Sequence, residues 1–176
     1  MLAIVRSATL SGITGRAVQV EVHVANGLPG FTVVGLPDAS CREARDRVRA
    51  AIVSSDLDWP MRRITVNLAP GDVPKVGAGL DLPMAVGVLA ASGQIPAEAL
   101  DGIGLVGELG LDGSVRPVPG AFPLVDAIEA PSVVISSADV RVAAIVAIGS
   151  VRSAISVSSR LFSGEPASGP MSRPSR

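Results

Sequence analysis

The chain has 176 residues, a formal net charge of −1 and an apolar fraction of 48%. This length suits one domain with a substantial core, and the small charge provides no overall attraction to nucleic acid or to anionic membranes. One cysteine, Cys41, excludes an internal disulfide bond, and one histidine, His23, excludes a multi-histidine metal site. Because aromatic residues make up only 2% of the chain, we expect Val, Ile, Leu and Ala to fill the core. The cysteine content fits a reducing, cytoplasmic compartment.

The N-terminal part of the chain predicts three strands. Residues 2–9 and 16–25 look like strands, and within the second one the stretch AVQVEVHVA alternates apolar and polar side chains with a period of two. The stretch SGITG between them predicts a hairpin loop. The turn cluster NGLPG then precedes a further short strand at residues 31–35.

Residues 38–55 predict a helix that carries most of the clustered basic residues. Asp38 or Ser40 can cap it, and Ser40 with Glu43 fits the S-x-x-E capping box. The arginines of this region could meet a phosphate backbone, but Glu43 and Asp46 interleave with them, so a solvated helix face or a subunit contact is an open alternative. If the chain contacts DNA, we expect the contact at Arg42, Arg45, Arg49, Arg62 and Arg63.

Two further reactive side chains have simple interpretations. His23 has the polar register of its strand, as Glu21 does, which indicates a solvent-facing residue. Cys41 lies at a helix start, where a thiol pKa can be lowered, but no histidine is near it in the sequence. We therefore interpret Cys41 as an inert residue of the helix.

The remainder of the chain predicts an α/β pattern without an internal repeat. The helix that begins near Asp81 is apolar all round, so it should be central and buried; Pro83 and Gly87 interrupt its apolar run, which is too short to cross a bilayer. The predicted elements are a strand at 63–69, a helix at 81–92, strands at 102–109 and 114–118, a helix near 119–129, a strand at 132–136, and helices at 137–146 and 156–162.

The loop GDVPKVGAGLDLP, residues 71–83, holds the only lysine of the chain, Lys75. A phosphate-binding P-loop needs G-x-x-x-x-G-K-[ST], but Val76 follows Lys75, so this motif is absent. A looser anion site at the helix start is an alternative that Asp81 would oppose. A Ser–Lys dyad needs a nucleophile, and residues 71–82 contain no Ser, Thr or Cys. We therefore predict a structural loop, with its main residues at Pro74, Lys75, Gly77 and Asp81.

Four blocks of sequence, in this order and spacing, resemble one protein family: GLPGFTVVGLPDAS, REARDRVRAAI, RITVNLAPGDVPKVGAGLDLPMAVGVLAASGQI and GLVGELGLDGSVRPVPG. They are similar to the N-terminal, ChlI-like domain of the magnesium-chelatase-like AAA+ ATPases of the YifB/ComM competence-protein family. The similarity covers roughly residues 1–165. It implies an α/β (α+β) fold with a mixed sheet and packed helices, like ribosomal protein S5 domain 2 and the catalytic domain of Lon protease.

The comparison with Lon proteases implies that this chain lacks protease chemistry. Their catalytic serine lies in a PKDGPSAG block, which here reads PKVGAGLD and has Gly79 at the serine position. Their catalytic lysine ends a G-E-x-x-x-x-G-x-V-x-P-x-x-G-x-K pattern, which here ends at Phe122. Lys75 corresponds to a structural lysine of the loop, and we expect Asp81 to cap the following helix.

The resemblance also implies a division of the full-length protein. We expect residues 1–163 to form the domain, and residues 164–176, rich in Ser, Pro and Gly, to be a disordered linker or a truncated end before an AAA+ module. Family members are thought to be hexameric ATPases, with ATP and Mg²⁺ held by that module, and some promote DNA branch migration during natural transformation. For this chain the resemblance implies a non-catalytic domain for assembly and DNA engagement, without a metal, cofactor or membrane contact.

Two alternatives belong to other functional classes. A residual peptidase would need an unconventional nucleophile, for which Ser114 and Ser92 are the candidates. An accessory subunit of a magnesium chelatase is suggested by the family name alone, because no residue pattern here predicts porphyrin or magnesium binding.

Overall fold

A computed structural model describes residues 1–36, 38–76, 78–136 and 141–144. The elements are β1 (Leu2–Ser11), β2 (Thr14–Ala25), β3 (Gly30–Val34), α1 (Asp38–Val53), β4 (Arg63–Ala69), α2 (Asp81–Ala91), the 3₁₀ helix η1 (Ala97–Leu100), β5 (Ile103–Val106), β6 (Glu108–Leu109), β7 (Val115–Arg116), α3 (Ala121–Ala127) and β8 (Ser132–Ile135).

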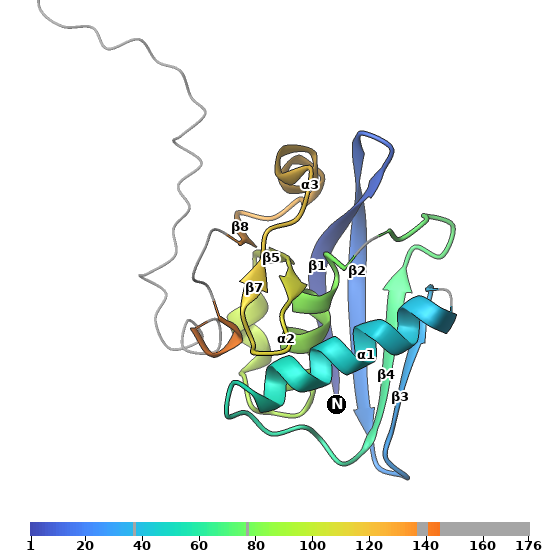
Figure 1. The fold of residues 1–176 in the computed structure, drawn as a ribbon, viewed down its shortest axis with the longest axis vertical. Coiled ribbons are helices and arrows are strands. Elements are labelled where there is room, and N and C mark those ends of the chain that lie inside the picture. The colour runs from blue at the N-terminus through green and yellow to red at the C-terminus, as the bar shows by residue number, and fades with distance from the viewer. Residues whose placement is uncertain (37, 77, 137–140, 145–176) are drawn as a thin grey trace, which may run out of the picture.

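Within the described residues, one mixed sheet has the strand order β3-β4-β2-β1-β5-β8 (Figure 1). β2 lies antiparallel to both β1 and β4, whereas the pairs β3–β4, β1–β5 and β5–β8 are parallel. β6 and β7 form a separate antiparallel hairpin. The predicted α/β fold with a mixed sheet is therefore confirmed.

The alternation of the strands produces the core. Val5, Val20 and Leu68 pair across β1, β2 and β4, and all three are buried. Every residue of α2 is buried as this helix packs on β1 and β2, which is the central position that its apolar sequence predicts. The approach is close, since a Cβ at Gly87 would lie 2.6 Å from Cγ2 of Val22. α1 packs on α2 and crosses in front of it in Figure 1.

Among the described elements, α3 is the helix that covers the opposite face of the sheet, at one end. α3 packs on β1 and β2 there, and a Cβ at Gly15 would collide with the backbone of Pro123. Farther along the strands, Leu2, Ile4 and Val34 are exposed on the same face. No helix of the described residues is long and apolar enough to cross a membrane.

The structure corrects three details of the sequence prediction. The strand expected at 102–109 is divided into β5 and β6, because the N–H and C=O of Gly107 bond to Gly79 and Leu82 in the loop and helix beside them. The helix expected near 119–129 is shorter, at Ala121–Ala127. α1 begins at Asp38, so Ser40 lies inside its first turn and the Ser40 capping box is wrong.

Only part of the predicted C-terminal structure falls within the described residues. Of the helix expected at 137–146, residues 142–144 are helical. The helix expected at 156–162 and the linker at 164–176 lie outside the described residues.

Candidate functional site

Lys75 bonds to the backbone of its own loop. Its ammonium group donates to the carbonyl oxygen of Pro70, and its side chain is partly buried. Partial burial lowers the pKa of Lys75, an effect that the carboxylate of Asp72 opposes. The N–H of Val76 donates to Oγ1 of Thr9 at 3.2 Å, which attaches the loop to β1. This loop is therefore a braced connection between β4 and α2.

The other three residues predicted for this loop, Pro74, Gly77 and Asp81, have different outcomes. Pro74 is exposed. Gly77 lies outside the described residues. Asp81 is the first residue of α2, and its side chain makes no cap hydrogen bond to this helix, so the prediction that Asp81 caps the helix is wrong.

Asp81 instead forms a buried ion pair with Arg47 of α1. Nε of Arg47 donates to Oδ2 of Asp81 at 2.6 Å, and Nη2 donates to Oδ1 at 3.2 Å. The backbone N–H of Leu109 approaches the same carboxylate at 3.4 Å. One carboxylate thus connects α1, α2 and β6, which a capping role would not achieve.

Burial and pairing act in opposite directions on this carboxylate. Only 2% of the Asp81 side chain is exposed, against 25% for Arg47. Burial raises the pKa of Asp81, and the hydrogen bond and charge of Arg47 oppose that rise. The same hydrogen bond raises the pKa of Arg47. Arg47 is therefore held by Asp81, whereas Arg42, Arg45 and Arg49 of the same helix are exposed.

The two positions that match the Lon dyad are Gly79 and Phe122. Gly79 has apolar neighbours, and Phe122 is exposed to solvent. A Cβ at Gly79 would meet Cγ1 of Val118 at 3.5 Å and Cγ1 of Val106 at 3.6 Å. Phe122 is an exposed residue of α3. Within 4 Å of the Cβ position at Gly79, the contacts in the described part of the chain are these two valine methyl groups.

The two alternative serines are engaged in local hydrogen bonds. Oγ of Ser92 donates to the carbonyl of Leu89 at 3.0 Å and accepts from Nε2 of Gln94 at 2.9 Å. Oγ of Ser114 donates to Oδ1 of Asp112 at 2.6 Å, and this bond lowers the pKa of Asp112. Both arrangements are typical of turns. The described residues also contain no group of three or more His, Cys, Asp and Glu side chains that could hold a metal ion.

The structure brings three of the five predicted arginines together. Arg42, Arg45 and Arg49 are exposed, and their spacing of three and four residues places them on one face of α1. Arg63 begins β4, where Ile64 faces the core, so Arg63 lies on the opposite face of the sheet. Arg62 is exposed just before β4, where its carbonyl accepts from the N–H of Gly30.

A hollow of about 340 Å³ lies beside this arginine row, between α1 and the edge strand β3. Arg45, Asp46 and Arg49 line it from the helix, and Phe31, Trp59 and Met61 are among the residues that line it from the other side. The rings of Phe31 and Trp59 are 5.7 Å apart at their centroids. The sequence analysis did not predict this contact. The one tryptophan of the chain, shortly before β4, is the sequence feature that could have indicated it.

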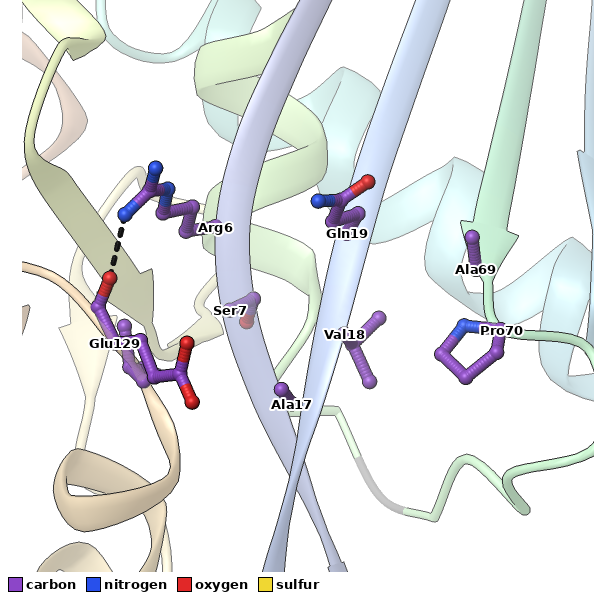
Figure 2. Close-up of a pocket in the computed structure, with 9 residues that line it drawn as sticks. Arg6, Ser7, Ala17, Val18, Gln19, Ala69, Pro70 and Glu129 are labelled. Carbon is purple, nitrogen blue, oxygen red and sulfur yellow. Dashed lines mark hydrogen bonds between the residues drawn. The ribbon is translucent and has the colours of Figure 1, made fainter.

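A second hollow, of about 430 Å³, lies on the partly open face of the sheet, where Arg6 and Gln19 project from β1 and β2 (Figure 2). Arg6 Nη1 donates to the carbonyl of Glu129, and Oγ of Ser7 donates to the carbonyl of Leu105 at 2.8 Å. Both polar side chains are thus engaged by backbone, and the residues described around this hollow include no nucleophile with a base.

Comparison with known proteins identifies the relatives of the chain. The family described as subunit ChlI of Mg-chelatase matches residues 20–139. The chain is 52% identical over 121 residues to the uncharacterized protein YifB of Salmonella typhimurium, an alignment that covers 69% of this chain and 24% of that protein. It is 49% identical over 124 residues to the competence protein ComM of Haemophilus influenzae, covering 70% of this chain and 24% of that protein.

An uncharacterized protein of Mycobacterium tuberculosis is 46% identical over 119 residues, covering 68% of this chain and 24% of that protein. The matched part is therefore about a quarter of the length of these relatives. The family match covers more than half of the chain, and it includes the arginine row of α1, the Lys75 loop and the Arg47–Asp81 pair. The chain belongs to the magnesium-chelatase-like YifB/ComM family, as its N-terminal, ChlI-like domain.

Proposed function

We propose that this chain is a non-catalytic domain that supports assembly and DNA engagement of a magnesium-chelatase-like AAA+ ATPase. The observation that carries the DNA part is the row of exposed guanidinium groups at Arg42, Arg45 and Arg49 on α1. Arginines on one helix face suit a phosphate backbone, which they neutralise with release of counterions. The relative in Haemophilus influenzae is named a competence protein, which agrees with a role in DNA uptake or recombination.

The full-length function that we propose is ATP-dependent DNA branch migration during natural transformation, by a cytoplasmic hexamer. ATP and Mg²⁺ would bind the AAA+ module of that protein and not this chain. The apolar surroundings of Gly79 and the exposed position of Phe122 support a non-catalytic role for the Lon-like fold. The purified chain should therefore show no ATP hydrolysis above a blank; hydrolysis that a point mutation abolishes would contradict the proposal.

The DNA role is tested by replacing the arginine row. The triple variant Arg42→Ala/Arg45→Ala/Arg49→Ala should bind forked DNA more weakly. The slope of log K against log salt, which is negative, should become smaller in magnitude by about 2 to 3. The double variant Arg62→Ala/Arg63→Ala should have a smaller effect, because Arg63 lies on the opposite face.

Arg16→Ala is the matched control, since Arg16 is exposed near the far end of β2. Titrations of a labelled fork at several salt concentrations measure all three variants. Equal affinity and equal salt slope for the triple variant, the control and the native chain would refute DNA engagement by this face.

The family description favours one other candidate, an accessory role in a magnesium chelatase. It predicts stable co-purification with a large chelatase subunit. Absence of such a complex, together with DNA binding through α1, would leave the DNA role as the better explanation.

A further inference from the structure

The hollow beside the arginine row has an apolar, aromatic side and a basic side. Its apolar side includes the half-buried rings of Phe31 and Trp59 and the exposed thioether of Met61. Its helix side presents the side chains of Arg45 and Arg49. Phe31 and Trp59 also pack on the main core, so the aromatic side is fixed in place.

A flat aromatic surface beside cationic groups suits an unpaired nucleobase. Every base has a π face that can stack on an aromatic side chain, and the phosphate that follows it can be neutralised by a neighbouring arginine. The volume, about 340 Å³, lies at the lower end of the range for small-molecule sites. In duplex DNA the bases are already stacked and paired, so this site would not accommodate them.

We propose that the hollow between α1 and β3 binds a base of single-stranded DNA, with the base against Trp59 and its phosphate at Arg49. This inference rests on the proposed DNA role of the chain and adds the form of DNA that is bound. It also assigns a function to Trp59, whereas phosphate binding by the arginine row does not involve Trp59.

Asp46 limits the electrostatic attraction of this site. Its carboxylate lines the hollow and pairs with Nε of Arg45 at 2.9 Å, so it partly neutralises that arginine and repels phosphate. Within the described residues Arg49 forms no ion pair with an acidic side chain, and it is therefore the stronger phosphate ligand. The Asp46→Asn variant should bind single-stranded DNA several-fold more tightly than the native chain. The Arg49→Ala variant should bind it more weakly than the Arg45→Ala variant.

The chain offers a direct probe, because it contains one tryptophan and no tyrosine. Its intrinsic tryptophan emission therefore reports on Trp59 alone. The titrants are a single-stranded oligothymidylate, an abasic oligonucleotide of the same length and a duplex of the same length. The oligothymidylate should quench Trp59 and bind about 5-fold or more tightly than the abasic strand, because stacking is worth about 1–3 kcal/mol per base. The duplex should leave the emission unchanged.

Two substitutions separate stacking from folding. Trp59→Phe keeps an aromatic ring and should retain most of the preference for the oligothymidylate over the abasic strand, whereas Trp59→Leu should remove it. Both variants lack the emitting residue, so their binding is measured by the fluorescence anisotropy of a labelled strand. Circular dichroism and thermal melting confirm that each variant is folded. The native chain with the abasic strand tests the same inference without any substitution.

The outcomes distinguish this inference from the DNA role itself. Equal affinity for the oligothymidylate and the abasic strand, with unchanged Trp59 emission, would overturn the base site and leave DNA binding by α1 intact. Binding of none of the three oligonucleotides would overturn both. A Trp59 emission that changes with protein concentration alone would instead show that a second copy of the chain covers the hollow, and would also overturn the inference.

Discussion

The ion pair between Arg47 and Asp81 makes an asymmetric prediction about stability. Arg47→Met keeps the aliphatic stem but leaves the Asp81 carboxylate, which is 2% exposed, without its cation. Loss of one partner of a buried pair costs about 3–5 kcal/mol of unfolding free energy, because the remaining charge is uncompensated. Asp81→Asn keeps an acceptor for Arg47, whose side chain is 25% exposed and can reach water. We expect that variant to lose only about 1–2 kcal/mol.

The double variant Arg47→Met/Asp81→Asn removes both charges. It should be more stable than Arg47→Met alone, because no buried charge is left without a partner. Arg45→Ala is the control, since Arg45 pairs with Asp46 on the exposed surface and such pairs contribute at most about 1 kcal/mol. Urea unfolding followed by the emission of Trp59 measures all four free energies.

The pH dependence provides a second, independent test. In Arg47→Met the opposing effect of the arginine is lost, so the pKa of the folded-state Asp81 rises further above its value in the unfolded chain. A raised folded-state pKa contributes stability that is present at low pH and is lost as pH rises through that pKa. The deficit of Arg47→Met should therefore be largest at neutral pH and shrink as the pH falls toward the range of ordinary carboxyl groups. The reasoning is refuted if Asp81→Asn is the more damaging change, if Arg45→Ala costs as much as Arg47→Met, or if the deficit grows on acidification.

Three further predictions concern the packing around α2. Gly87→Ala should lower the unfolding free energy by about 1–3 kcal/mol, because its Cβ would lie 2.6 Å from a Val22 methyl; an unchanged melting temperature would contradict this close approach. Gly79→Ser should fold normally, since its Cβ makes only ordinary contacts, and should not react with a serine-directed phosphonate; labelling at position 79 would show that a base is in reach. Lys75→Met should remove the bond to Pro70, a loss of about 1 kcal/mol, and should speed proteolysis in the 70–76 loop; unchanged cleavage would argue against a bracing role.

The sequence predicts local structure well where one periodicity dominates. The alternation in β2 and β4 identifies both strands and their buried faces, and the apolar sequence of α2 indicates its central position. The division between β5 and β6 could not be predicted, because it depends on backbone bonds from Gly107 to Gly79 and Leu82, which are distant in the sequence. A glycine inside a strand pattern is only a weak sign of such a break.

The candidate site shows the same limit more clearly. Spacing predicts the row Arg42, Arg45 and Arg49, since all three lie on one helix. The partner of Arg47 is 34 residues away in the sequence, so the arginine that is withdrawn from the surface looks the same as its neighbours. Trp59 comes beside the row only because the loop after α1 places it against Phe31 of β3, and that contact is a tertiary feature.

The start of α2 is a structural joint that also holds α1. The start of this helix is held by backbone bonds between Gly79, Leu82 and Gly107 and by the carboxylate of Asp81. None of these contacts needs a nucleophile at position 79, where valine methyl groups fill the surroundings. The segment around Gly79 therefore joins α2 to β5 and β6 through the backbone of Gly107. Arg47 connects this joint to α1, whose exposed side carries Arg42, Arg45 and Arg49.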